Sequence, residues 1–391
     1  MSQIPVNPSP DVLRLIHEGY EVEIRGAYLV VSHVPYVNST CAVRYGTLVS
    51  TLTLNGDVIT KPDTHVVQFA GEHPCHRDGS IMREIQHASA DSAMADGIVV
   101  NHSFSNKPAN GYANYYEKMS RYVEVISAPA RAIDPTATAK TFRVVEAKPC
   151  QSVFNYLDTN SSRADIEGIS AKLKGCKVGI VGLGGTGSYV LDLVAKTPVE
   201  EVHLFDGDVF AQHNAFRAPG APSVEQLKEP PPKVSYFTEI YSKMRKGIIP
   251  HAEFLDASNV SMLSGLSFVF LCLDNGRVKQ EIMAFLEAVG ASFVDVGMGV
   301  HIGDNNLLGI IRVTASSPAN RSLFRKHVSF TDGEDAAYAS NIQIADLNML
   351  NAAFAVLRWK KFAGFYQDLE NEHHTTYSTN VNQFLSEKAG S

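Results

Sequence analysis

The sequence predicts an α/β domain with a mostly parallel sheet, preceded by a separate, largely β (α+β) domain. Two observations support this. A strand, a glycine turn and a helical pattern follow one another in residues 177–195, and β-branched runs separated by glycines recur in the first 150 residues. A chain of 391 residues can bury two cores. We expect an N-terminal domain of unknown role over residues 1–150, the α/β domain over residues 151–366, and a polar, mobile tail over residues 367–391.

The N-terminal domain is predicted from its short strand-like runs. Residues 20–24 and 28–32 alternate in polarity or are rich in β-branched residues, and glycines at later positions punctuate further runs of the same kind. The strand-like run 141–145 is followed by a proline, which cannot donate a ladder hydrogen bond. We therefore expect the two domains to join near residues 147–150.

A glycine-rich loop opens the α/β domain. The apolar run 178–181 predicts a buried parallel strand, and a helical pattern begins at Tyr189. Gly182 permits a tight turn, Gly184 lets the backbone approach a phosphate, and Gly187 allows close packing of helix on strand. Free N–H groups at the start of the helix favour an anion. The loop, which also contains Gly185, therefore predicts a Rossmann-like nucleotide site.

Polar residues follow the ends of the next predicted strands. Asp206 ends the strand 201–205 and lies 206 − 187 = 19 residues after the last glycine, near the spacing of a carboxylate that holds a ribose hydroxyl of NAD or ATP. A further polar series favours ATP, because hydride transfer needs neither a divalent metal nor a clamp on a third phosphate. This series comprises Asp208, Asn214, Arg217, Lys233, Asp274 and Asn275.

In order and spacing these motifs resemble the ThiF/MoeB/ubiquitin-activating (E1-like) adenylyltransferase family. The resemblance covers roughly residues 160–365 and implies a sheet of the ThiF/MoeB adenylation type, ATP and Mg²⁺ as cofactors, and a homodimer. It implies that Asp206 binds the ribose and that Asp274 holds Mg²⁺. It also implies that the phosphates are gripped by Asn214, Arg217 and Lys233.

Three further residues have two interpretations each. Asp208 and Asn275 either contact the nucleotide or cap the ends of strands. An arginine before the glycine strand often reaches the partner subunit's phosphates in this family. Arg163 is the nearest candidate here, and the alternative is an exposed arginine at a helix start, paired with Asp165.

The resemblance implies ATP-dependent adenylation of a carboxylate with release of pyrophosphate. The preferred substrate is the C-terminal carboxylate of a ubiquitin-like or sulfur-carrier protein. Residues 1–150 resemble a domain of unknown function in bacterial ThiF-like proteins encoded beside ubiquitin-like and conjugating-enzyme-like proteins, which adds a conjugating-enzyme-like protein as a partner. The alternatives are adenylation of a peptide or other small or tRNA-bound carboxylate, and a nucleotide-binding sensor or scaffold without catalysis.

The cysteines depart from the family. Relatives that form a thioester carry a cysteine in a crossover segment, and others have two Cys-x-x-Cys pairs for structural zinc. The last of the five cysteines here is Cys272, inside the strand that leads to Asp274. Cys75 is left as a thioester candidate, because neighbouring histidines could lower its pKa. The same His73, Cys75, His76 and Asp78 cluster is either a zinc site or a histidine-rich turn.

The segment expected to contain the crossover is basic instead. Its cations either guide an acidic or C-terminal-carboxylate partner or belong to a solvated loop. They are Arg312, Arg321, Arg325 and Lys326.

A long helix is predicted over residues 342–359. Leu347, Leu350, Phe354 and Leu357 step by three, four and three residues along one face. Such a face requires cover, either from a homodimer interface or from the rest of the domain.

The composition excludes several classes of protein. A formal net charge of −7 argues against nucleic acid as the main partner. No uninterrupted apolar run reaches membrane-spanning length, and the first residues lack the pattern of a signal peptide. Five unevenly spaced cysteines suggest free thiols in a reducing compartment, so we expect a cytoplasmic protein.

Overall fold

The computed structural model forms two compact units, which are described separately. One contains Met1–Val145 and Asp158–Asp165, and the other contains Glu146–Leu157 and Ile166–Ser391. The predicted join at residues 147–150 lies outside the described residues. The structure describes residues 9–25, 27–55, 58–94, 97, 99–144, 152–156, 158–164, 166–274, 276–328 and 342–388.

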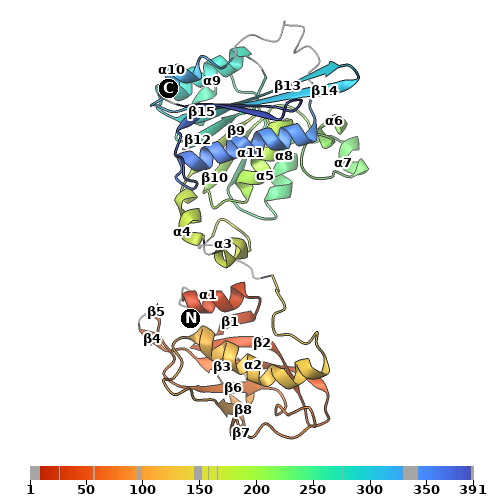
Figure 1. Cartoon of the computed structure of the whole chain (residues 1–391), viewed down its shortest axis with the longest axis vertical. Coiled ribbons are helices and arrows are strands. Elements are labelled where there is room, and N and C mark those ends of the chain that lie inside the picture. Colours follow the sequence, from red (N-terminus) through yellow and green to blue (C-terminus); the bar gives the residue numbers. More distant parts are fainter. Residues whose placement is uncertain are drawn as a thin grey trace. The chain divides into compact units, whose positions relative to one another are not determined.

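The N-terminal unit is built on a six-stranded antiparallel sheet with the order β1-β2-β3-β6-β8-β7 (Figure 1). Its strands are β1 (Glu21–Arg25), β2 (Tyr28–Val37), β3 (Val43–Thr51), β6 (Val66–Ala70), β7 (Gln86–Ala93) and β8 (Val99–Ser105). A separate two-stranded ladder joins β4 (Leu54–Asn55) and β5 (Val58–Ile59). The helices are α1 (Pro10–His17), α2 (Tyr115–Ile133) and α3 (Thr159–Arg163).

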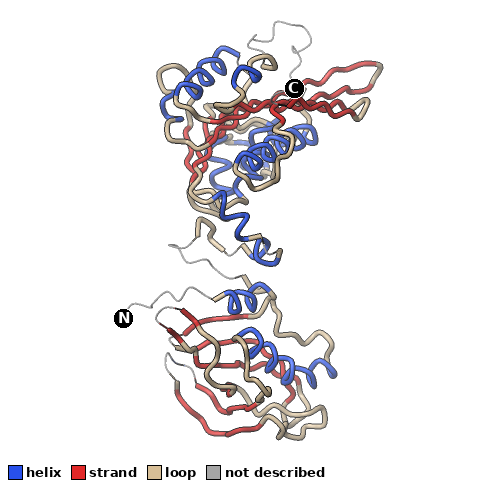
Figure 2. Tube along the Cα trace, turned by 60° about the vertical axis from the view of Figure 1, so that its left-hand side comes forward, coloured by secondary structure: helices blue, strands red, loops and turns tan. Residues whose placement is uncertain are grey.

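Helix α2 packs along this sheet and supplies much of its core (Figure 2). The helix begins at Asn114, whose side chain accepts a hydrogen bond from the backbone N–H of Glu117 at 2.8 Å. Tyr115, Met119 and Tyr122 then recur at helical spacing on the buried face and meet the apolar side chains of β2, β3, β6 and β8. The prediction of a largely β N-terminal domain is confirmed.

The second unit contains an eight-stranded sheet with the order β11-β10-β9-β12-β13-β14-β15-β16. Neighbouring strands from β11 to β13 are parallel, and those from β13 to β16 are antiparallel, which confirms the predicted mostly parallel core. The strands are β9 (Lys177–Val181), β10 (Glu201–Phe205), β11 (Ile248–His251), β12 (Phe268–Leu271), β13 (Ser292–Gly303), β14 (Asn306–Ser316), β15 (Glu372–Ser378) and β16 (Gln383–Lys388).

Helices cover both faces of this sheet (Figure 1). One face packs against α5 (Gly185–Ala195), α8 (Lys233–Tyr241) and α11 (Ala345–Phe362), and the other against α9 (Gly276–Ala288) and α10 (Arg321–Phe324). The remaining short helices are α4 (Glu167–Ser170), α6 (Gln212–Ala215) and α7 (Val224–Lys228). None of the helices formed by the described residues is both long enough and apolar enough to span a bilayer.

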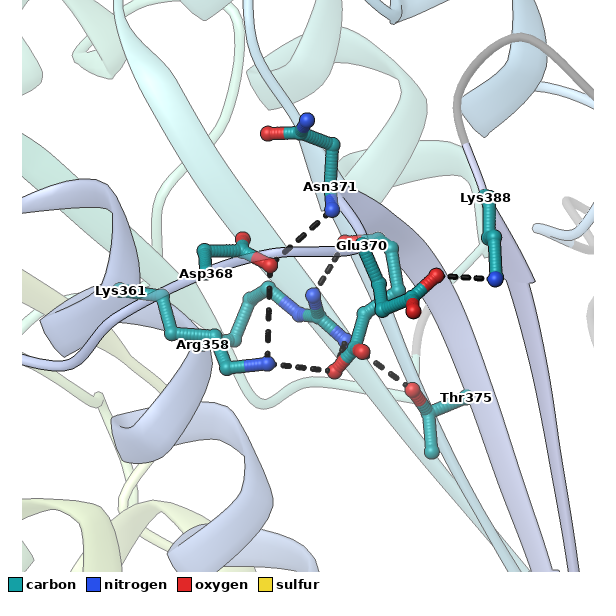
Figure 3. Close-up of polar contacts among 8 residues, drawn as sticks. Arg358, Lys361, Asp368, Glu370, Asn371, Thr375 and Lys388 are labelled. Carbon is teal, nitrogen blue, oxygen red and sulfur yellow. Dashed lines mark hydrogen bonds and ion pairs between the residues drawn. The ribbon is translucent and has the colours of Figure 1, made fainter.

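The expectation of a mobile tail over residues 367–391 is wrong for residues 372–378 and 383–388, because these form β15 and β16 and extend the sheet. The entry into β15 is fixed to α11 by ion pairs of Arg358 and Lys361, both labelled in Figure 3, with Glu372. Oε1 of Glu372 lies 2.9 Å from Nη2 of Arg358 and 2.9 Å from Nζ of Lys361. Arg358 is buried, so this pairing shields a charge that would otherwise be costly to bury.

The predicted helix at residues 342–359 is observed as α11, but its buried face differs from the predicted one. Leu357 is 39% exposed, whereas Asn348 and Asn351 are buried. The prediction rested on the spacing of apolar residues alone. The buried face also includes these two polar side chains, which line a cavity of the second unit.

The buried Lys118 of the N-terminal unit gives a testable pH dependence of stability. Its Nζ donates to the Ser50 hydroxyl at 2.9 Å, and burial lowers its pKa from 10.5 to about 8. Below pH 8 the folded state carries the full cost of this buried charge. As the pH rises from 8 toward 10, the folded state loses the proton before the unfolded state does, so stability increases.

We expect Lys118→Met to stabilise the unit at pH 7 by about 1–3 kcal/mol and to remove the gain in stability between pH 7 and 9.5. Calorimetric unfolding of the full chain at both pH values measures this. The exposed Lys107→Met is the control. An unchanged pH dependence in Lys118→Met would contradict the assignment.

Candidate nucleotide-binding site

A cavity of ≈ 450 Å³ lies at the carboxyl ends of the parallel strands of the second unit. Its wall includes residues at or just after the ends of β9, β10 and β12, residues within β13, the first residues of α5, and two asparagines of α11. The chain passes from β9 to β10 and β11 on one side and to β12 and β13 on the other. The cavity therefore lies at a topological switch point, where open α/β sheets bind ligands.

The glycine loop between β9 and α5 adopts the predicted turn. Gly182 has a φ of +87°, a conformation that residues with a Cβ rarely adopt. A Cβ on Gly187 would lie 1.9 Å from the carbonyl oxygen of Gly182, which confirms that glycine allows the close packing there. A Cβ on Gly184 would meet no atom within 4 Å, so the loop faces open space in the cavity at this point.

Helix α5 begins at Gly185, earlier than the pattern around Tyr189 suggested, because glycines hide the helical periodicity. Its N-cap residue is Gly184, which has no side chain that could accept a capping hydrogen bond. The first N–H groups of a helix need acceptors, and they carry the positive end of the helix dipole. The cavity wall includes Gly184, Gly185 and Thr186. The start of α5 is thus built to receive an anion.

Asp206 connects the glycine loop to β10 and α8. Its carboxylate accepts hydrogen bonds from the backbone N–H of Leu183 at 2.6 Å and of Asp208 at 2.8 Å. Nζ of Lys233 lies 3.4 Å from Oδ1 of Asp206 and 2.7 Å from Oδ2 of Asp208. The three charged residues lie together in the cavity wall, as the sequence predicted for one site.

Arg217 lies in the cavity wall, and one nitrogen of its guanidinium group makes no hydrogen bond to the described residues. Its Nε is buried and has no hydrogen-bond partner among the described residues. Asn214 is buried and lies outside the cavity wall as the described residues define it. Its Oδ1 accepts from the backbone N–H of Ala211 at 2.8 Å. Asn214 therefore fixes the start of α6, which precedes Arg217.

The other predicted residues are placed less completely. Asp274 is exposed and lines the cavity just after β12. Asn275 lies outside the described residues. Arg163 belongs to α3 of the N-terminal unit, and its side chain also lies outside the described part of the chain.

Comparison with known proteins identifies the family. A model of the ThiF family matches residues 123–355. The chain belongs to the ThiF family. A domain of unknown function, DUF6791, matches residues 10–159. No curated protein matches the chain by sequence.

Solved structures with similar folds include MccB of E. coli with ATP, PaaA, and TcdA (CsdL). MccB is 17% identical with a TM-score of 0.44, and the match covers 57% of this chain and 66% of MccB. PaaA is 16% identical over 78% of this chain and 99% of its own, with a TM-score of 0.45. TcdA is 18% identical over 52% of this chain and 92% of its own, with a TM-score of 0.40. These likenesses are too weak to inform the function.

The sequence analysis did not identify all residues that line the cavity. Asn348 and Asn351 reach it from α11, far along the chain from the glycine loop. Oδ1 of Asn348 accepts from the Thr186 hydroxyl at 2.8 Å, while its buried Nδ2 has no partner among the described residues. Nδ2 of Asn351 donates to the carbonyl of Gly297 at 3.0 Å. The signal available was a pair of asparagines three apart in an apolar helix.

Phe254 was also missed, because it follows β11 in a segment without a recognisable motif. It lines the cavity and is 65% exposed, next to the buried Leu255. A large apolar ring left accessible in a cavity is suited to stacking on a planar base.

Cys75 does not have the properties expected of a reactive thiol. It is buried, and burial raises the pKa of its thiol instead of lowering it. Within the described residues, no group of three metal-ligating side chains assembles around His73, Cys75 and His76. The histidine-rich turn is therefore the better description of this segment.

Three of the four basic residues from Arg312 onward form contacts within the protein. Arg312 lies in β14 and forms an ion pair with the buried Asp295 at 2.6 Å. Arg321 and Arg325 lie at α10, where the first donates to the carbonyl of Glu287 and the second pairs with its carboxylate. These three arginines hold secondary structure together, which does not support the idea of a free basic stretch that guides a partner.

Two glycine variants separate packing from ligand approach. Gly187→Ala places a methyl group against a backbone oxygen, so we expect it to destabilise the second unit by at least about 3 kcal/mol. Gly184→Ala should fold with near-wild-type stability and weaken ATP binding at least about tenfold, because the methyl group enters the space next to the loop. Trp359 fluorescence during denaturation and calorimetric ATP titration measure these effects. Wild-type ATP affinity in a folded Gly184→Ala variant would contradict a phosphate position at this loop.

Proposed function

We propose that this ThiF-family protein binds ATP in the cavity and adenylates a carboxylate, releasing pyrophosphate. The observation that carries the proposal is the convergence, in one cavity wall, of the open face of the glycine loop with the cations Arg217 and Lys233. Both features provide donors for an anion in one cavity. Adenylyl transfer builds negative charge on the phosphates, and such donors stabilise that charge.

Each residue of the site has a physical role in this proposal. The start of α5 donates backbone N–H groups to the phosphates. Arg217 offers the planar fork that suits two phosphate oxygens, and Lys233 has three donors, which allow it to contact phosphate while it stays near Asp208. A carboxylate has about four acceptor positions, so Asp206 keeps capacity for a ribose hydroxyl beside its existing bonds.

Metal and base binding complete the site. Asp274 would hold Mg²⁺, which would neutralise charge on the phosphates. Oxygen ligands at the end of β12 fit this hard cation. Phe254 and Leu255 would form the apolar wall for the adenine base.

The proposed substrate is the C-terminal carboxylate of a ubiquitin-like or sulfur-carrier protein. Membership of the ThiF family supports this class. The absence of a cysteine after Cys272 supports an enzyme that stops at the acyl-adenylate, which another protein's nucleophile then takes. The matched domain of unknown function keeps a conjugating-enzyme-like protein as a proposed partner.

We also propose a homodimer. Met349 and Leu357 of α11 are 52% and 39% exposed, and such apolar side chains suit an interface. Arg163 reaching the partner subunit's phosphates remains part of this proposal. Light scattering tests the dimer, and mixing Arg163→Ala with Asp274→Ala chains tests whether the sites share residues.

Arg217 provides the direct test of phosphate recognition. We expect Arg217→Ala to weaken ATP binding at least about tenfold, because a charged donor in a partly buried cavity is lost. Arg217→Lys should recover only part of the affinity, since lysine lacks the planar fork. Calorimetric ATP titration provides the measurement. Arg121→Ala, a surface arginine of α2 with a side chain 52% exposed, is the control. Equal affinity in Arg217→Ala and the control would reject the proposed phosphate site.

Pyrophosphate exchange distinguishes the substrate classes. The full chain is incubated with ATP, Mg²⁺, labelled pyrophosphate and a panel of purified carrier proteins, each with a control lacking its C-terminal residue. Exchange that depends on one intact carrier supports the proposal. Exchange with a short peptide or small carboxylate supports the alternative substrate, and ATP binding without exchange under any condition supports a sensor or scaffold.

A further inference from the structure

A second cluster of functional side chains lies at the edge of the sheet formed by β15 and β16. None of the described residues that line the nucleotide cavity belongs to these two strands. A nitrogen of His327, a nitrogen of His373 and a carboxylate oxygen of Glu387 all lie within 4.8 Å of one another. His327 follows α10, His373 belongs to β15, and Glu387 belongs to β16. Among the described residues, this is the group whose ligand atoms are close enough to share an ion.

A β-bulge directs His373 into this cluster. Glu372 pairs with Lys388 and His374 pairs with Glu387, so β15 advances two residues while β16 advances one. His373 is the extra residue. In a regular strand His373 and His374 would point to opposite faces, yet both are buried here. Bulges of this kind re-aim side chains and are frequent at functional sites.

The His373 ring is buried and its hydrogen-bonding capacity is unused. Only 2% of the residue is exposed, and neither ring nitrogen has a hydrogen-bond partner among the described residues. A buried imidazole normally satisfies at least one nitrogen, because an unpaired buried polar group is costly. A metal ion would satisfy the nitrogen that faces His327 and Glu387.

The geometry of His327 and Glu387 suits replacement of a proton by a metal. Nε2 of His327 lies 3.0 Å from Oε2 of Glu387. Two ligands bound to the same tetrahedral Zn²⁺ at ordinary bond lengths lie about 3.3 Å apart. An ion can therefore take the place of the shared proton with a small shift of these side chains, and the exposed side chain of Glu387 has room for that shift.

Neighbouring residues hold the His327 ring in place. The ring of His374 stacks on it with centroids 3.9 Å apart and planes 17° apart. Nδ1 of His374 lies 2.9 Å from the Thr314 hydroxyl, which accepts a hydrogen bond from Nη1 of Arg312 at 2.9 Å. At metal sites, neighbouring groups of this kind orient the side chains that bind the metal.

We propose that His327, His373 and Glu387 bind a divalent transition metal ion of the Zn²⁺ class. Two imidazoles and one carboxylate are typical Zn²⁺ ligands, while Mg²⁺ and Ca²⁺ prefer oxygen alone. A water molecule completes a tetrahedral set. The donor set contains no cysteine, so it differs from the paired-cysteine zinc sites of relatives. The ion joins the segment after α10 to the terminal strands β15 and β16.

Zinc binding to the tag-free full chain tests the proposal. Chelator-treated protein is titrated with Zn²⁺ by calorimetry, and bound metal is counted by elemental analysis after gel filtration. We expect one ion per chain for the wild type and an increase in the unfolding temperature, because Zn²⁺ binds the folded state. His301→Ala, which removes an exposed histidine of β13, should behave like the wild type.

His373→Ala and Glu387→Gln should each lose stoichiometric Zn²⁺ binding and the thermal shift. Glu387→Gln changes an exposed residue and keeps its shape, so it remains informative if His373→Ala does not fold. Co²⁺ in place of Zn²⁺ should give the visible absorption of a tetrahedral site in the wild type and in His301→Ala, but not in His373→Ala or Glu387→Gln. Absence of Zn²⁺ binding by the wild type, or equal binding by Glu387→Gln, would overturn the proposal. ATP binding is measured separately and has no bearing on this outcome.

Discussion

The close contact between Gly187 and the carbonyl of Gly182 is the constraint on which the rest of the nucleotide site depends. With 1.9 Å between that oxygen and the position of a Cβ, no other residue fits at Gly187 without moving the backbone. The contact sets where α5 starts and therefore where its N–H groups point. Asp206 then fixes the same loop from the side by accepting the N–H of Leu183. Two local contacts thus determine the position of the anion-binding donors.

The cavity retains polar groups that folding alone does not require. The Nδ2 of Asn348 and the Nε of Arg217 are buried without hydrogen-bond partners among the described residues. Unpaired groups of this kind each cost about 1–3 kcal/mol, so a protein selected only for stability would replace them. Both residues line the cavity at the switch point in the sheet, so their polar character is related to the site and not to the apolar core.

A similar reasoning applies to the antiparallel end of the sheet. Strands at a sheet edge expose unpaired backbone groups, and proteins protect such edges with charges, bulges or covering elements. Here the ion pairs of Arg358 and Lys361 with Glu372 fix the start of β15, and the bulge at His373 interrupts its pairing with β16. Specific ion pairs and a bulge therefore determine the structure of this region, and they leave both His373 and His374 buried.

The sequence by itself determined the parallel core and the order of the motifs around the nucleotide site. The strand 201–205 and the turn at Gly182 were predictable because they depend on short-range patterns, namely an apolar run and a glycine that can adopt a positive φ. Asp206 and Asp274 were expected at one edge because strand ends in a parallel sheet meet there, whereas Arg217 and Lys233 were expected from the family motifs. In the structure all four residues line one cavity.

Only the tertiary structure decided which distant elements complete these sites. Asn348 and Asn351 reach the cavity because α11 packs across α5 and β13, and no local pattern specifies that packing. Burial likewise raises the pKa of the Cys75 thiol against expectation, and Val37 of the distant strand β2 forms a bridge with this residue. The polar end of the chain became two strands because β14 offered an edge to pair with, and pairing partners are a property of the folded sheet.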